Sequence, residues 1–284
     1  METCLEGAKG KVTISSGGPF VIIGEKINPT GRKKLAAALQ EGGFEYIRQL
    51  AVSQVQAGAD VLDINVGSPD IDEVAVLPQV VRLIAEAVDV PLCLDSSNRQ
   101  ALAAALLVAP GRPLVNSVNG EEANLANLLP LIKDRGAAVI GLAMDENGIP
   151  GDPQTRLAIA GRILERAAKI GIPPEDVIID PLVLTVGADS QAAAVTLQTI
   201  ELVRREFGVN INLGASNVSF GLPDRDTINQ AFLALAMGAG ATCAITDPQR
   251  LAGVVRAADL LLGRDAYARR YITLYRSRQA RTPH

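Results

Sequence analysis

Two kinds of segment alternate eight times along this chain. One kind is short and almost continuously apolar, which is typical of a strand buried on both faces of a parallel sheet. The strand candidates are Val21–Ile27, Val61–Val66, Pro91–Asp95, Leu114–Ser117, Ala138–Met144, Val177–Asp180, Asn210–Gly214 and Thr242–Thr246. The other kind is rich in Ala and Leu and has a helical period. The helix candidates are Glu45–Gln56, Val74–Val88, Gln100–Leu107, Glu122–Arg135, Thr155–Ile170, Ala192–Phe207, Asp226–Ala239 and Gln249–Leu262.

Each strand–helix pair takes about 30 residues, which is the usual size of a βα unit. Eight consecutive units predict a (β/α)8 TIM barrel, a single domain over residues 20–263. A doubly wound open sheet is the alternative fold for the same alternation. We expect residues 1–19 to form an N-terminal extension that covers the bottom of the barrel, and residues 264–284 to form a C-terminal helix and tail.

Charge and cysteine content exclude several classes of protein. The chain has 284 residues with 27 Lys and Arg against 31 Asp and Glu, so its net charge of −4 argues against a nucleic-acid partner. No apolar run reaches the roughly 18 residues of a membrane span, and the first residues lack a signal-peptide pattern. We therefore expect a cytoplasmic protein without a membrane partner. The three cysteines form no C-x-x-C pair, which argues against a disulfide framework and a structural zinc site.

The only histidine in the chain is its last residue, His284. Unless the tail folds back, a histidine triad, an imidazole general base and a histidine-ligated metal are unavailable. The chemistry must then use carboxylates, amides, hydroxyls and guanidinium groups.

Carboxylates and carboxamides stand at the ends of most predicted strands. Because active sites of (β/α)8 barrels form where the strands end, these side chains are predicted to surround one mouth. In chain order they are Glu25, Asn28, Asp63, Asn65, Asp95, Asn116, Asn119, Asp180, Asn217 and Asp247. Singly, each is more typical of a turn or helix cap, above all Asn119 and Asp247. Their recurrence favours a binding site.

Two kinds of ligand suit such a ring. Oxygen ligands could hold Mg²⁺, but the chain has no D-x-D-x-D loop and no histidine partner, so we expect no bound metal. A flat heterocycle with several N–H groups suits the ring better, since a carboxylate accepts two donors side by side and an amide both donates and accepts. A pterin has this pattern of donors and acceptors.

Several motifs carry a family resemblance that runs from about Val21 to Leu262. The segments Ile23–Lys34 and Gly214–Arg225 resemble motifs of the folate module of cobalamin-dependent methionine synthase. Other segments resemble even more closely the methyltetrahydrofolate:corrinoid (iron–sulfur) protein methyltransferases. These are Leu92–Asn98, Asn116–Ser117, Ile140–Met144 and Ile179–Leu182. The resemblance therefore implies a barrel of the pterin-binding type.

The resemblance also implies roles for individual residues. Asp95, Asn116 and Asp180 match the residues that hold the pterin ring, and Asn217 matches the amide beside N5, the nitrogen that carries the methyl group. The resemblance thus makes Asn217, Asp95 and Asp180 the candidate catalytic residues. The other candidate folate-binding residues are Glu25, Asn28, Asp63, Asn65, Phe220 and Arg225. Phe220 stands where the corrinoid/iron–sulfur enzymes have glutamine and methionine synthase has phenylalanine, so this position leaves the subfamily open.

The implied activity is methyl transfer between N5 of 5-methyltetrahydrofolate and the cobalt of a corrinoid. Without an internal histidine the chain lacks the base-off cobalamin motif Asp-x-His-x-x-Gly, so we expect the corrinoid on a partner protein, such as a corrinoid iron–sulfur protein. The direction of transfer is left open. A homodimer is expected from the apolar helices near Ala231–Met237 and Val254–Leu262.

Two alternatives to this activity remain. A dihydropteroate synthase has a similar pterin grip, but the strand-7 lysine and the strand-8 arginine and histidine of that family are missing from Gly214–Val218 and Ala244–Asp247. A non-catalytic pterin-binding subunit is the second alternative, and a turnover assay would distinguish it from an enzyme.

Overall fold

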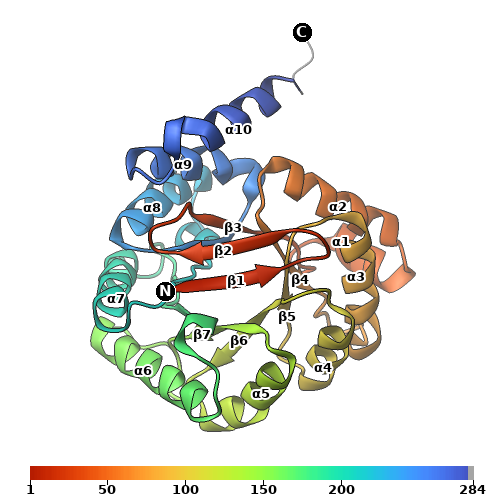
Figure 1. Cartoon of the computed structure of the whole chain (residues 1–284), viewed down its shortest axis with the longest axis horizontal. Coiled ribbons are helices and arrows are strands. Elements are labelled where there is room, and N and C mark those ends of the chain that lie inside the picture. Colours follow the sequence, from red (N-terminus) through yellow and green to blue (C-terminus); the bar gives the residue numbers. More distant parts are fainter. Residues whose placement is uncertain (281–284) are drawn as a thin grey trace.

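Figure 1 shows a computed structural model of the chain, which describes residues 1–280. The end of the predicted tail, with His284, lies outside the described residues. The strands are β1 (Glu2–Glu6), β2 (Lys11–Ser15), β3 (Val21–Ile27), β4 (Val61–Asn65), β5 (Leu92–Asp95), β6 (Leu114–Asn119), β7 (Ala138–Leu142), β8 (Val177–Asp180) and β9 (Cys243–Thr246). The α-helices are α1 (Lys33–Glu41), α2 (Phe44–Ala57), α3 (Glu73–Ala87), α4 (Arg99–Val108), α5 (Glu122–Arg135), α6 (Pro153–Lys169), α7 (Ala192–Phe207), α8 (Arg225–Ala239), α9 (Pro248–Leu261) and α10 (Arg269–Gln279). Short 3-10 helices are η1 (Pro174–Asp176), η2 (Ala215–Ser219) and η3 (Ala266–Ala268).

A parallel sheet curls into the barrel that the sequence predicts, with helices around its outside (Figure 1). Its strand order is β8-β7-β6-β5-β4-β3-β9, and every pair is parallel. Strand side chains pack on both faces, outward against the helices and inward against one another, which explains why the strands are almost continuously apolar. The βα repeat therefore forms a closed barrel and not an open sheet.

The seventh predicted strand, Asn210–Gly214, is not a regular strand. It makes only isolated bridges, between Ile211 and Ile179 of β8 and between Gly214 and Ile245 of β9. The N–H of Ile211 donates to the side-chain Oγ1 of Thr242 at 2.9 Å, where a ladder would use a backbone carbonyl. This side-chain bond interrupts the ladder, yet the segment still lies between β8 and β9 and closes the barrel.

The N-terminal residues form the antiparallel hairpin β1–β2, which crosses the end of the barrel in Figure 1. Leu5 and Ile14 are fully buried and pack with Val21, Cys93 and the other apolar side chains inside the barrel. The amide of Asn210 donates to the Thr3 hydroxyl and to the Ile14 carbonyl, both at 2.8 Å. The hairpin thus seals the barrel at the start of the strands and leaves their C-terminal ends as the open mouth.

Two helical segments differ from the sequence expectation. Helix α1 is not among the predicted helices, because its apolar face is narrow and only Leu35 and Leu39 are buried. The C-terminal segment predicted as one helix is divided into η3 and α10, because Tyr267 and Ala268 adopt positive φ angles. In the described part of the chain, no helix combines the length and apolar character that crossing a bilayer requires.

Candidate functional site

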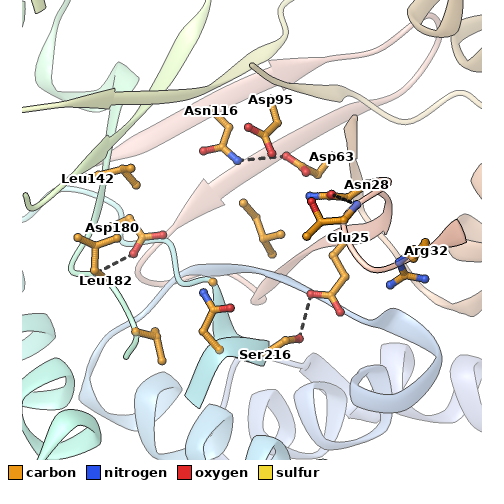
Figure 2. Close-up of a pocket in the computed structure, with 15 residues that line it drawn as sticks. Glu25, Asn28, Arg32, Asp63, Asp95, Asn116, Leu142, Asp180, Leu182 and Ser216 are labelled. Carbon is orange, nitrogen blue, oxygen red and sulfur yellow. Dashed lines mark hydrogen bonds between the residues drawn. The ribbon is translucent and has the colours of Figure 1, made fainter. Parts of the chain in front are cut away.

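A cavity of about 350 Å³ opens at the C-terminal ends of the strands. Seven of the ten candidate site residues line it: Glu25, Asn28, Asp63, Asp95, Asn116, Asp180 and Asn217. Figure 2 labels all of these side chains except Asn217 and shows the labelled ones converging from separate strands and loops on one space. The prediction that the polar strand ends surround a common mouth is therefore confirmed for these seven positions.

Three neighbouring strands build one wall of the cavity. Asp95 of β5 and Asn116 of β6 are register partners, and Asp63 of β4 pairs with Cys93, two residues before Asp95. The amide of Asn116 donates to Oδ1 of Asp63 at 3.3 Å (Figure 2). Asn65 does not line the cavity, and its amide instead donates to Oδ2 of Asp95 at 2.9 Å. This hydrogen bond from Asn65 fixes the orientation of the Asp95 carboxyl group.

Burial raises the pKa of both carboxyl groups in this wall, Asp63 and Asp95. Desolvation raises the pKa of Asp95 to about 6, although the Asn65 hydrogen bond opposes the shift. Desolvation and the neighbouring Asp95 carboxylate raise the pKa of Asp63 well above its ordinary value. Two carboxyl groups so close in a buried site resist ionising together. The pair therefore disfavours two negative charges in this part of the cavity.

Asp180 at the end of β8 also lines the cavity and is only 5% exposed. Its Oδ1 accepts from the backbone N–H of Leu182 at 2.8 Å, and its Oδ2 accepts from the amide of Asn212 at 2.7 Å. Desolvation raises its pKa to about 6 even with these hydrogen bonds. The carboxyl group is therefore fixed in orientation and faces the cavity.

A buried arginine supports the Asp180 turn. Arg156 of α6 is 1% exposed, and its Nη1 donates to the carbonyls of Pro181 and Leu182, both at 2.9 Å. Its positive charge also lowers the pKa of Asp180 slightly against the effect of burial. Arg156 and Asn212 are both absent from the sequence candidates, because a helix residue and a mid-strand amide give no sign of their contacts.

Glu25, within β3, and Asn28, directly after β3, line a third part of the cavity. The hydroxyl of Ser216 donates to Oε2 of Glu25 at 2.9 Å (Figure 2). Burial raises the pKa of Glu25, and the Ser216 bond opposes this shift. Asn28 accepts from the backbone N–H of Thr30 at 3.0 Å, which is an Asx turn that shapes the loop before α1. Sequence reasoning missed Ser216, whose residue type is common in loops.

The loop after the seventh barrel position carries the remaining candidates. Asn217 lies on η2 and lines the cavity. A Cβ atom at Gly214 would stand 3.0 Å from the Asn217 amide, so a glycine there leaves room for this side chain. Phe220 is 68% exposed and does not line the cavity. Arg225 also stays outside it, and its guanidinium donates to Ser219 Oγ at 3.0 Å and to the Ser216 carbonyl at 2.6 Å.

Two members of the predicted ring have local structural roles. Asp247 caps α9 through the N–H of Gln249 and pairs with Lys26. Asn119 accepts from the N–H of Glu121 at 3.0 Å, as a turn residue does. Apolar side chains that the sequence did not single out complete the cavity: Leu142, Leu182, Val183 and Ile245. Polar groups facing an apolar wall suit a flat, partly polar ring.

The chain matches the family of pterin binding enzymes over residues 24–247. This chain belongs to that family. It is 33% identical over 265 residues to the methylcorrinoid:tetrahydrofolate methyltransferase of Eubacterium limosum, covering 90% of this chain and 96% of that protein. It is also 30% identical over 244 residues to the methionine synthase of Mycobacterium tuberculosis, of which it covers 20%.

Solved structures of pterin binding enzymes share the fold. A Yersinia pestis dihydropteroate synthase with a pterin–sulfa conjugate superposes with a TM-score of 0.69 at 18% identity, covering 93% of this chain and 99% of that one. A Xanthomonas albilineans dihydropteroate synthase gives a TM-score of 0.68 at 20% identity, covering 94% and 100%. These likenesses show the barrel architecture. Within residues 1–280, no group of three or more His, Cys, Asp or Glu side chains is placed to hold a metal ion.

Proposed function

We propose that this protein transfers a methyl group between N5 of tetrahydrofolate and the cobalt of a corrinoid held by a partner protein. The observation that carries the proposal is that two hydrogen-bonded carboxyl groups, Asp95 and Asp180, line one cavity together with the amides of Asn116 and Asn217. The name and the near full-length match of the Eubacterium relative support the corrinoid as the other methyl carrier.

In the proposed complex the pterin ring lies flat in the cavity. The 2-amino group and ring N–H groups donate to the carboxyl groups of Asp95 and Asp180, and the Asn116 amide pairs with the ring acceptors. Because these side chains are already hydrogen-bonded to Asn65, Asn212 and the Leu182 N–H, they need little reordering when the ligand enters.

Methyl transfer from N5 needs help from the protein. The methyl group leaves a tertiary amine, and a negative nitrogen is a poor leaving group unless N5 is protonated. The Asn217 amide is proposed to hydrogen-bond to N5 or its proton and so to stabilise the changing charge. The partner's cobalt accepts the methyl group in one direction and supplies it in the other, and the open mouth gives that partner access to N5.

A spectroscopic assay tests the proposal in both directions. Methyltetrahydrofolate mixed with Co(I) cobalamin and the protein should give the methyl-Co(III) spectrum, and tetrahydrofolate with methyl-Co(III) should give the reverse change. The relative's name favours the second direction. A parallel assay with 6-hydroxymethyldihydropterin diphosphate and p-aminobenzoate covers the dihydropteroate synthase alternative. Folate binding without turnover in any assay would instead indicate a non-catalytic pterin-binding subunit and overturn the proposal.

A further inference from the structure

Strand β3 contains an extra residue where it reaches the mouth of the barrel. Two residues, Glu25 and Lys26, lie between its paired positions Gly24 and Ile27, whereas β4 has only one residue between the partners of these positions. The side chains confirm the irregularity, because Ile23 packs inside the barrel and Ile27 packs against the helices. Residues four apart share one face of a regular strand. Glu25 and Lys26 therefore form a β-bulge.

The bulge changes the direction of the charged side chains of β3. Gly24 faces α2, since a Cβ atom at Gly24 would stand 2.6 Å from Oε1 of Gln54 on that helix. In a regular strand Lys26 would face α2 as well, because alternate residues share a face. Lys26 instead lines a neighbouring cavity of about 320 Å³, where it pairs with Asp247, and Glu25 lines the first cavity. The bulge thus brings both charged side chains to the mouth.

A side chain of α2 hydrogen-bonds to this bulge. The backbone N–H of Lys26 donates to Oε1 of Gln54 at 2.8 Å. A regular ladder would offer this N–H a carbonyl of a neighbouring strand. Because Gly24 has no Cβ atom, the Gln54 side chain can approach the strand closely enough to make the bond.

Gln54 occupies a position that packing alone would give to an apolar side chain. It follows Ile47 and Ala51 on the buried face of α2 and is itself fully buried. Its Nε2 has no hydrogen-bond partner within residues 1–280. A buried donor without a partner reduces stability. The favourable contribution of the Gln54 amide is therefore its hydrogen bond to the bulge.

We propose that Gln54 is a positioning residue of the binding site, which fixes the bulge of β3 and so directs Glu25 into the ligand cavity. There the Glu25 carboxyl group accepts from Ser216 and can meet the ligand (Figure 2). Gln54 lines neither of the two cavities, so it acts on the ligand through β3. The inference rests on the proposed function, because it takes a folate as the ligand that Glu25 contacts.

The test measures tetrahydrofolate binding by calorimetry under anaerobic conditions and folding by urea unfolding. Gln54→Met removes the acceptor at a similar side-chain volume and should weaken binding about tenfold, as should Glu25→Ala. The double variant should bind no more weakly than the weaker-binding single variant, because both changes remove the same contribution. Gln54→Glu keeps an acceptor oxygen at the same place and should retain most of the wild-type affinity.

Thr246→Val is the matched control. Thr246 is the register partner of Gly24 on β9, and its buried Oγ1 also has no hydrogen-bond partner within residues 1–280. It lines neither cavity, so its replacement should leave the folate affinity unchanged. Gly24→Ala tests the contact from the strand side, because its Cβ atom would displace the Gln54 oxygen from the Lys26 N–H. It should weaken binding as Gln54→Met does, and it decides the inference if Gln54→Met does not fold.

The outcomes separate this inference from the proposed function. Additive losses from Gln54→Met and Glu25→Ala, or equal losses from Gln54→Met and Gln54→Glu, would overturn the inference, since general loosening of the barrel would then explain them. Wild-type affinity in Glu25→Ala, or in folded Gln54→Met, would also overturn it. In all these cases the wild type binds tetrahydrofolate and the proposed function stands. If the wild type does not bind tetrahydrofolate, the proposed function fails, and the inference fails with it.

Discussion

Replacing Asp95 with asparagine should stabilise the protein and impair its ligand binding. Burial raises the pKa of Asp95 from an ordinary 3.8 to about 6. At neutral pH the carboxyl group is ionised, and its negative charge is less stable in the folded protein than in the unfolded chain. Asparagine has nearly the same shape and removes the charge. Its side-chain oxygen can still accept from the Asn65 amide, which within residues 1–280 is the one side-chain donor to Asp95.

The size of the effect follows from linkage between folding and protonation. A shift of about two pKa units corresponds to about 3 kcal/mol at neutral pH. Asp95 faces the cavity and retains some solvent contact, so we expect about 2 kcal/mol. The sign depends on pH, because the folded state binds the proton more tightly than the unfolded chain. Wild-type stability is therefore reduced at pH values above 6, and the reduction disappears as the pH falls toward 4.

Urea unfolding of the wild type and Asp95→Asn at pH 7.5 and pH 4 measures this difference. The variant should be more stable by about 2 kcal/mol at pH 7.5, where it also removes the repulsion that raises the pKa of Asp63, and about equal at pH 4. In the proposed complex the variant presents an amide donor to pterin donors, so calorimetry should show weak tetrahydrofolate binding. A difference in stability that is the same at both pH values would refute the burial argument.

Three further results are expected. Asn217→Ala should lower the methyl-transfer rate about a hundredfold, and folate affinity by less; equal losses in both would exclude the role proposed for the amide at N5. Asp180→Ala should abolish pterin binding, because buried N–H donors of the ligand lose their acceptor, and a normal affinity by calorimetry would contradict this. Tetrahydrofolate affinity should fall between pH 7.5 and pH 5 as Asp95 and Asp180, both with pKa about 6, become protonated, whereas a flat profile would mean that neither carboxylate accepts from the ligand.

The sequence predicted the position of polar side chains at the mouth where one rule of the fold decides the outcome. In a parallel barrel all strands end at one mouth, so Asp95 at the end of β5 and Asp180 at the end of β8 must meet there whatever the details of packing. The same rule placed Glu25, Asp63 and Asn116 at this mouth, although it could not show which of them bond to one another.

Side-chain direction was not predictable from strand position alone. Asn65 ends β4 as Asp95 ends β5, yet Asn65 turns to its neighbour and stays out of the cavity. Asp247 stands at the end of β9 but caps α9. Each choice depends on a contact with another element, and such contacts leave no pattern in the sequence.

The sequence also did not predict several site residues that come from outside the strands, because their contacts depend on other elements. Arg32 precedes α1 and Ser216 lies on the short helix η2, whose positions depend on the packing of neighbouring elements, and Arg156 reaches the Asp180 turn from α6. The broken seventh strand was also unforeseen, because the Thr242 hydroxyl that interrupts its ladder is far along the chain from Ile211.

The histidine content and the buried carboxyl groups are connected in the proposed reaction. Residues 1–283 contain no histidine, the side chain that ordinarily exchanges protons near neutral pH. Burial moves Asp95 and Asp180 into the same range, with pKa values of about 6. A network of carboxyl groups can then hold or release a proton as the charge on N5 changes, and Asn217 can orient it. Activation of N5 therefore needs no imidazole, provided that the barrel keeps these carboxyl groups buried.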